Sequence, residues 1–488
     1  MTDPSFGVGA MIAAGVFLAA LIVTGFVARS RRRSESLEEF YLAGRSLGPL
    51  VLLLTLFATQ YSGNGFIGYP GEAYRSGFAW VMSVGFMTAV IAVYLSFAPK
   101  LHRLSRQREF VTPGDWINHR FGSPPLTLIA NAVFLFAMCN YLLAQLITMG
   151  HITEALSGQV IPFWAGVLAL GLVVLIYETV GGMRAVAWTD CAQGIVLLLG
   201  LVGILVMVVP GVGGLREASD WMMVHQPERT MVPDGVVLRN WASSIILIGF
   251  GAAVYPQAIQ RIFAARNARA LKQSLSIMAF MPLFTVLPVF LVGILAIPTL
   301  DQLDGVAADQ VMPLMLAHWS GTSSLLYVLS VVLLIGGLAA IMSTADSVLL
   351  SLSSIISKDI IGRHWMKTAT QDQLTRTGKR ISWVLMLILV VVALNPRITL
   401  WGLTELKMEV LVQTAPLFVF ASIWPRLHAS AAIGGIVLGL IVGIGLTLTG
   451  YGKLWGIHAG VLGLVVNVAT CVALSLIKLG SNRYSFRA

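Results

Sequence analysis

Small side chains and hydroxyls share a helix face, flanked by one carboxylate, in a long apolar stretch of the sequence. Four of them, spaced by three or four residues, are Ala340, Ser343, Thr344 and Ser347. Residues with this spacing lie on one side of an α-helix, and Asp346 flanks that side. Because a small hard cation prefers oxygen ligands, this face could bind one. Alternatively, the hydroxyls bond back to their own helix or hold neighbouring helices together.

A second carboxylate, Asp190, follows the stretch 181–186 at the start of another apolar run. An unpaired charge within a span is costly, Arg184 is too close to the loop to be an assured partner, and no other basic residue lies within these two runs. We therefore expect Asp190 and Asp346 to form a second cation site, for sodium or a proton. The alternative is that Asp190 caps a helix N-terminus and Asp346 faces water.

Glycine and proline interrupt two of the apolar runs. The first break reads Ala58–Gly65 and then Gly68–Gly71, and the other reads Gly249–Gly251 and then Tyr255–Gln257. Hydrocarbon cannot satisfy the backbone groups that such breaks free, so breaks are tolerated where protein buries them or where they line a wet cavity. We expect a substrate site here, although glycine can also simply let helices pack closely. The candidate substrate-binding residues at the breaks are Gln60, Ser62, Gly63, Asn64, Phe250, Tyr255, Pro256 and Gln257.

Three charged residues, Glu405, Lys407 and Glu409, lie near the start of a late apolar run. One interpretation is an outer gate in which Lys407 faces an anionic substrate and is itself a substrate-binding residue. The other is a charged outer helix end that stands in water.

The elements that hold these residues must be membrane helices, because the chain is too apolar to be soluble. Of its 488 residues, 57% are hydrophobic and 11% are charged, whereas soluble domains carry about 25% charged residues. Three cysteines cannot build a secreted disulfide framework. We expect an all-α polytopic membrane protein in which residues 1–488 form a single transmembrane transporter domain.

Thirteen apolar runs approach the length of about 20 residues that a spanning helix needs. The second and seventh contain the breaks, which fits transporters built from two inverted repeats, here spans 2–6 and 7–11. The runs centre on residues 7–28, 48–69, 77–99, 126–149, 160–180, 188–210, 241–260, 274–297, 323–350, 379–395, 399–424, 429–449 and 456–477.

The basic residues predict the orientation of these spans. A basic cluster at 29–33 follows the first run, which is typical of a true span with its N-terminus outside. With thirteen alternating spans, about 25 of the 32 Lys and Arg residues fall in loops on the inside, as the positive-inside rule requires. The C-terminus is then expected inside, and the location is the plasma (inner) membrane, with the lipid bilayer as surroundings.

Other classes of function find little support. The net charge of +10 is spread over short loops instead of one patch, so we expect no nucleic-acid partner. The eight histidines lie almost entirely in loops or at span ends, so we expect no catalytic or metal cluster and no enzyme activity. A membrane sensor would need an appended signalling domain, which we do not expect, and no obligate protein partner is evident.

Four segments resemble the sodium/solute symporter family, and the resemblance extends over about residues 5–477. They are Glu39–Leu47, Gly181–Val186 with Trp188–Asp190, Pro256–Gln257 with Arg261–Ala265, and Ile341–Thr344. The resemblance implies a leucine-transporter-type five-plus-five repeat and sodium (Na⁺) as the coupling ion. It also implies a first sodium site formed by the carbonyls of Ala58, Tyr61 and Ala340 and the hydroxyls of Ser343 and Thr344. In some members a second sodium site exists, and its positions here are Asp190, Ser343, Asp346 and Ser347.

Two positions depart from the family pattern. Gln60 stands where proline importers have Asp, and Asp346 stands where members with the second site tend to have a hydroxyl. We therefore expect a sodium-coupled importer of a small organic acid, such as a monocarboxylate or a pantothenate-like anion, with Lys407 and Arg261 as candidate positive charges. The alternative substrate is an amino acid such as proline.

Overall fold

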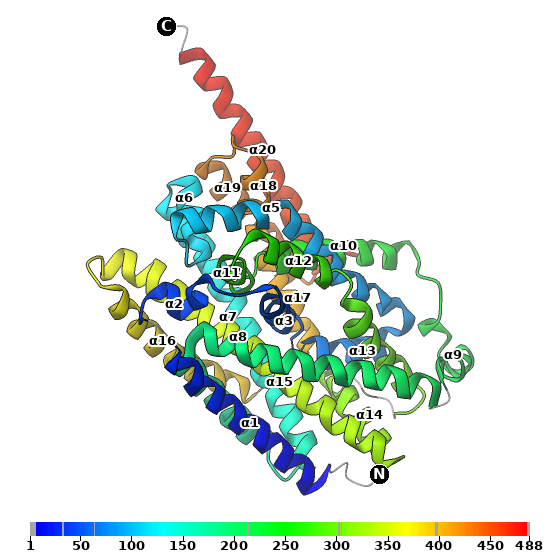
Figure 1. Ribbon diagram of the computed structural model, residues 1–488. Helices are drawn as coiled ribbons and strands as arrows, with labels where there is room; N and C mark the ends of the chain where they lie inside the picture. Colours follow the sequence, from blue (N-terminus) through cyan, green and yellow to red (C-terminus); the bar gives the residue numbers. More distant parts are fainter. Residues whose placement is uncertain are drawn as a thin grey trace.

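The computed structural model describes residues 6–31, 34–62, 64–211, 214–300, 303, 305–395 and 399–485, and these form an almost entirely helical molecule (Figure 1). The only strands in these ranges are β1 (Lys453–Leu454) and β2 (Ile457–His458), which pair antiparallel in a short hairpin. The described part of the chain therefore agrees with the expected all-α class.

The first half of the chain contains the first break, between α3 and η2. In chain order they are α1 (Gly7–Ser30), α2 (Leu37–Leu42), η1 (Ala43–Arg45), α3 (Pro49–Gln60), η2 (Asn64–Gly68), α4 (Tyr69–Ser76), η3 (Gly77–Gly85), α5 (Phe86–Arg108), α6 (Pro113–Phe121), α7 (Pro124–Ser157), α8 (Phe163–Gly211), α9 (Gly214–His225) and η4 (Pro227–Arg229).

The second half begins with the helix that carries the other break. Its elements are α10 (Gly235–Ala253), α11 (Pro256–Ala264), α12 (Ala268–Met278), α13 (Pro282–Ala296), η5 (Gly305–Gln310), α14 (Val311–Ser320), α15 (Ser324–Ser354), η6 (Ile355–Trp365), α16 (Gln371–Ala393), α17 (Leu400–Leu411), η7 (Val412–Leu417), α18 (Val419–Ile423), α19 (Ala429–Leu448) and α20 (Ala459–Ser485).

Within the described residues, ten helices are long and apolar enough to cross a membrane. Three of them, Gly65–Arg108 with 44 residues and Phe163–Ile204 and Ser324–Trp365 with 42 residues each, are about twice the length that one crossing needs. The second of these bends at Gly182, where φ is 60° and ψ is −155°. A Cβ at Gly182 would come within 2.7 Å of the Phe40 carbonyl, so only glycine fits this bend.

The first predicted break is confirmed. The regular helix α3 ends at Gln60, Tyr61 leaves the helical region with φ −87° and ψ 86°, and the chain resumes as the π-helical turn η2. Because a helix leaves its last carbonyls without helical partners, this ending exposes backbone oxygens in the middle of the molecule.

The second break is confirmed at its Tyr255–Gln257 part and not at Gly249–Gly251. Helix α10 continues through Gly249–Gly251 to Ala253, and α11 starts afresh at Pro256, with the interruption at Val254 and Tyr255. A Cβ on Gly249 would come within 3.1 Å of Ala89, and one on Gly251 within 2.9 Å of Met408. These two glycines therefore serve close helix packing, and the prediction of a break at that pair was wrong.

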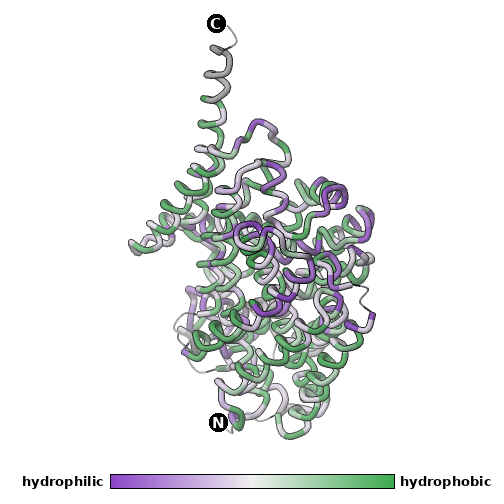
Figure 2. Tube along the Cα trace, turned by 90° about the vertical axis from the view of Figure 1, so that its left-hand side faces the viewer, coloured by the Kyte–Doolittle hydropathy of each residue, from purple (hydrophilic) through white to green (hydrophobic). Residues whose placement is uncertain are grey.

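The long helices α8 and α15 form the centre of the packing. Helix α15 lies against α7 and α8, α1 covers α8 on the outside, and α3 and α11 pack against this group near the two breaks. Figure 1 shows α1 starting at one end of the molecule and α20 leaving at the other. Hydrophobic residues dominate the helices, and many hydrophilic ones gather toward the end where α20 emerges (Figure 2).

The connection η5 folds back onto α4 and α17. Asp309 of η5 is buried, accepts a hydrogen bond from the backbone N–H of Leu400 at 2.9 Å, and lies 3.8 Å from the guanidinium of Arg75. Arg75 also pairs with Glu72 at 2.7 Å. Burial raises the pKa of Asp309 to about 6, although the Leu400 N–H and Arg75 both favour its charged form.

Candidate functional site

A cavity lies beside the first break. Of the predicted substrate-binding residues, Gln60, Ser62, Tyr255 and Lys407 line it, and they come from α3, from the break itself, from the second break and from α17. Gln60 is fixed by a hydrogen bond from its amide to the Tyr94 hydroxyl at 2.8 Å.

Among the described residues that line this cavity, Lys407 is the charged one. Its side chain is only 2% exposed, and its ammonium lies 3.2 Å from the centre of the Tyr141 ring and 5.4 Å from that of Tyr255. The two rings are stacked, with centroids 5.1 Å apart. Aromatic faces stabilise a desolvated cation, so this arrangement can hold a buried ammonium directed at a ligand.

The other charged residues of α17 serve different contacts. Glu409 is buried and bonds to the backbone N–H of Gly460 and to His458 at 3.2 Å, while Glu405 pairs with Lys453 at 2.7 Å. Both glutamates therefore face the α19–α20 hairpin instead of the cavity. The interpretation of this segment as a helix end in water is wrong for Lys407 and Glu409, because both are buried.

The five remaining predicted substrate residues lie elsewhere or are not described. Phe250 lines a separate apolar cavity with Phe420 and Leu464. Pro256 and Gln257 are fully buried at the start of α11 and do not line the first cavity. Gly63 and the side chain of Asn64 fall outside the described residues. The structure thus brings together only part of the predicted set.

The predicted first sodium site is centred on the hydroxyl of Thr344. This hydroxyl lies 3.3 Å from the carbonyl oxygen of Ala58 and 3.0 Å from that of Ala340. The Ala58 carbonyl is available because α3 ends two residues later, and Tyr61 donates its N–H to Phe57 at 2.9 Å. All three oxygens are buried, and such a set of oxygen donors fits a small hard cation.

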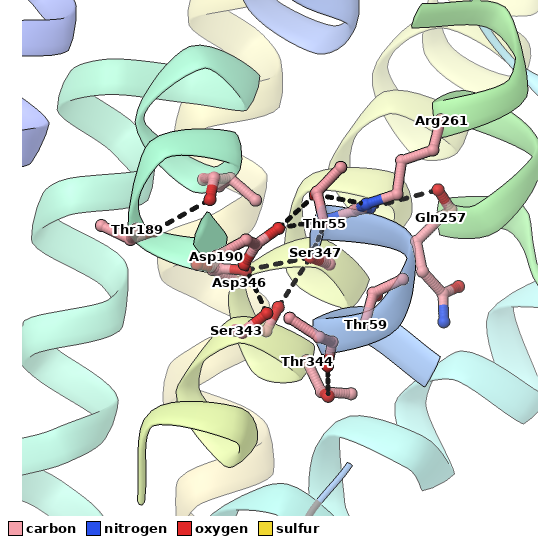
Figure 3. Close-up of polar contacts among 12 residues, drawn as sticks. Thr55, Thr59, Thr189, Asp190, Gln257, Arg261, Ser343, Thr344, Asp346 and Ser347 are labelled. Atoms are coloured by element: carbon pink, nitrogen blue, oxygen red, sulfur yellow. Dashed lines mark hydrogen bonds and ion pairs between the residues drawn. The ribbon is translucent and has the colours of Figure 1, made fainter. Parts of the chain in front are cut away.

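Ser343, also predicted for the first sodium site, turns its hydroxyl to Asp190 instead (Figure 3). Thr55 donates to the same carboxylate. The guanidinium of Arg261 lies 3.0 Å from Asp190, and both side chains are fully buried. Arg261 also donates to Ser347 at 2.5 Å and, through Nε, to Thr55 at 2.8 Å.

Two expectations about Asp190 were therefore wrong. It lies inside the second half of α8, not at a helix N-terminus, and its charge is compensated by a basic residue from another span. Arg184, which was not expected to be an assured partner of Asp190, pairs with Glu39 of α2. Arg261 was a candidate for binding the substrate, but its contacts lie in this cluster and it does not line the cavity.

Asp346 is fully buried, so the alternative in which it faces water is wrong. One carboxylate oxygen accepts from the Tyr177 hydroxyl at 2.6 Å, and the other lies 3.0 Å from Ser347. Ser347 and Arg261 connect Asp346 to Asp190, so the structure does bring the two predicted carboxylates into one cluster (Figure 3).

Several residues of these sites were missed from the sequence. Thr55 precedes the break by one helical turn and is a hydroxyl in an apolar run, a signal that could have identified it. Tyr141 and Tyr177 lie in long apolar helices, where an aromatic residue is indistinguishable from one that only packs. Their roles depend on contacts with Lys407 and Asp346, which are distant in sequence.

A family model and three relatives each match most of this chain. A model of the sodium:solute symporter family matches residues 40–439. The sodium/pantothenate symporter of Haemophilus influenzae is 27% identical over 469 residues, covering 93% of this chain and 92% of the relative. The sodium/pantothenate symporter of Escherichia coli is 29% identical over 86% of each chain, and the sodium/proline symporter of Salmonella typhimurium is 27% identical over 92% and 91%.

Solved structures show the same fold. A Na⁺-coupled sialic acid symporter in a substrate-bound outward-open state superposes with a TM-score of 0.79 at 20% identity, covering 97% of this chain and 98% of the other. MhsT in complex with L-phenylalanine gives a TM-score of 0.52 at 13% identity over 88% and 99%. The fold is thus of the leucine-transporter type, as expected. Because the family match extends over most of the chain, the protein belongs to the sodium:solute symporter family.

Proposed function

We propose that this plasma-membrane protein is a sodium-coupled importer of a small organic anion and that the whole chain forms one transmembrane transport domain. The anion occupies the cavity at the first break, with its carboxylate on Lys407. Sodium is carried with it, at the carbonyls of Ala58 and Ala340 and the hydroxyl of Thr344.

One observation carries the choice of an anion. Among the described residues that line the cavity, Lys407 is charged and none is acidic. In addition, no carboxylate of the described chain lies within 4 Å of its ammonium. A buried ammonium without a counter-charge favours a ligand that supplies one. A zwitterion would bring its own ammonium into a cavity that offers this second cation no carboxylate.

The two proposed sites are close enough to be coupled. The ring of Tyr141 holds Lys407, and its hydroxyl lies 3.5 Å from the carbonyl of Thr59, the residue after Ala58. Sodium bound at Ala58 and Thr344 joins α3 to α15 and fixes the end of α3 that lines the cavity. Each ligand should therefore raise the affinity for the other, since a coupling free energy acts equally in both directions.

Thirteen spans with the N-terminus outside and the C-terminus inside remain our proposal for the topology. Beyond the ten, Phe163–Ile204 accounts for a second crossing, α3 with η2 supplies another, and the amphipathic α16 supplies one more. Spans 2–6 and 7–11 then form the two repeats. The opposite positions of the start of α1 and the end of α20 support an odd number of crossings (Figure 1).

An amino-acid substrate is the second candidate, because a sodium/proline symporter is among the relatives that match over nearly the whole chain. Gln60 favours the anion over this candidate: its amide is occupied by Tyr94 and offers no charge to an amino group.

The test is uptake into proteoliposomes that contain the purified protein, with an inward sodium gradient. Labelled pantothenate and short monocarboxylates should accumulate, and proline should not. Pantothenol, which replaces the carboxylate of pantothenate by an alcohol, is the matched control and should not compete. Sodium-driven uptake of proline together with indifference to every carboxylate would contradict the proposal.

A further inference from the structure

We infer that Arg261 is a built-in cation that occupies the position of a second sodium ion, so that one sodium ion binds to this protein. The inference rests on the proposed sodium-coupled function and specifies its ion stoichiometry. It concerns the cluster of Asp190, Asp346, Ser343 and Ser347, for which the sequence predicted a second cation.

The guanidinium lies inside this cluster. Arg261 is fully buried and donates to Asp190 at 3.0 Å, to Ser347 at 2.5 Å and to Thr55 at 2.8 Å. Its remaining contact is with the carbonyl of Gln257, one turn earlier in α11, at 3.2 Å. The planar fork of arginine thus places its charge at the carboxylate while its other N–H groups bond to surrounding oxygens (Figure 3).

Each carboxylate oxygen of the cluster already faces a protein donor or hydroxyl. One oxygen of Asp190 accepts from Ser343, and the other accepts from Thr55 and Arg261. The two oxygens of Asp346 face the hydroxyls of Tyr177 and Ser347. A sodium ion needs several oxygen lone pairs directed at one point, and here the guanidinium and these hydroxyls take them.

The start of α11 holds Arg261 in place. Pro256 begins this helix directly after the second break, and α11 packs against α3 and α15. Arg261 thereby connects α11 with Thr55 of α3, Asp190 of α8 and Ser347 of α15. A mobile sodium ion would enter and leave this position in every cycle, whereas a side chain remains and adds no ion to the transported charge.

The first sodium position is arranged differently. Its oxygens, on Ala58, Ala340 and Thr344, belong to two backbone carbonyls and one hydroxyl, and no basic side chain of the described chain bonds to them. The two positions are therefore distinct, one open to an exchangeable ion and one filled by Arg261.

The experiment counts bound sodium on the full-length protein in detergent, using radioactive sodium at equilibrium and no organic substrate. The wild type should bind one ion per protein with a non-cooperative isotherm. Thr344→Ala leaves the contacts of Arg261 unchanged and should shift the whole isotherm to higher sodium concentration. Asp190→Asn should retain one ion. Arg261→Gln frees the oxygens and should bind two, and the second ion should be lost again in Arg261→Gln with Asp190→Asn.

Two ions bound to the wild type would overturn the inference if Asp190→Asn loses one of them or if Thr344→Ala leaves the affinity for one of them unshifted. This result would leave the proposed function intact. If Arg261→Gln does not fold, the wild-type count and the Thr344→Ala isotherm still decide. No saturable sodium binding to the wild type would instead overturn the proposed function together with this inference.

Discussion

Replacing Asp190 by Asn should destabilise the protein because it leaves the guanidinium of Arg261 buried without a counter-charge. Both side chains are fully buried and 3.0 Å apart. Two unit charges about 4 Å apart attract by about 4 kcal/mol at the effective dielectric constant that describes protein sites. Breaking a buried pair by removing one partner costs about 3–5 kcal/mol, so we expect Asp190→Asn and Arg261→Met each to lower the free energy of unfolding by that amount.

The double variant distinguishes a coupled charge pair from two independent losses of stability. Asp190→Asn with Arg261→Met removes both charges, so it should be no less stable than either single variant, with a coupling of about 3 kcal/mol or more. Thermal unfolding in detergent and sodium-free buffer measures the order of stability, since sodium could otherwise replace the missing cation. Asp346→Asn is the matched control, because its carboxylate bonds to Tyr177 and Ser347 and not to Arg261. If the two single effects add in the double variant within about 0.5 kcal/mol, the residues do not form a pair.

Three further variants test the two sites and the buried Asp309 of η5. Lys407→Met should raise the KM for a carboxylate about tenfold to a hundredfold, because the variant loses the binding free energy of a hydrogen bond between charged groups. The control Lys453→Met, which removes the partner of Glu405, should leave uptake unchanged. Thr344→Ala should raise the sodium concentration for half-maximal uptake about fivefold or more, and Thr344→Ser, which retains the hydroxyl, should restore it. Because burial raises the pKa of Asp309 from 3.8 to about 6, the folded protein keeps this proton to higher pH than the unfolded chain, and its stability should fall by about 3 kcal/mol as the pH rises through that interval. Asp309→Asn should remove this loss; identical pH profiles of melting temperature for variant and wild type would refute the assignment.

The sequence was sufficient for the features that depend on local pattern. Apolar runs indicate the membrane helices, Gly and Pro mark the break after Gln60, and a spacing of three or four residues places Thr344 and Ser347 on one face of α15. Each of these features follows from helix geometry or from the cost of unpaired backbone groups in hydrocarbon. These two arguments need no knowledge of the neighbouring helices.

Features that depend on contacts between distant segments could not be predicted. Arg261 and Asp190 are 71 positions apart and on different helices, and a search for partners within the spans of the carboxylates does not find this pair. Phe250 lies near the second break in sequence, but the turn of α10 directs it to another cavity. Lys407 is charged near a helix end, and only the rings of Tyr141 and Tyr255 reveal that it is buried.

The central claim is that sodium bound between α3 and α15 drives the uptake of an anion held by Lys407. The most direct measurement is concentrative uptake of a labelled carboxylate into proteoliposomes with sodium outside and potassium inside, compared with the same vesicles with potassium on both sides. The account predicts accumulation above the external concentration only with the sodium gradient, and its loss in Lys407→Met. Equal accumulation under both conditions, or undiminished accumulation by Lys407→Met, would contradict it.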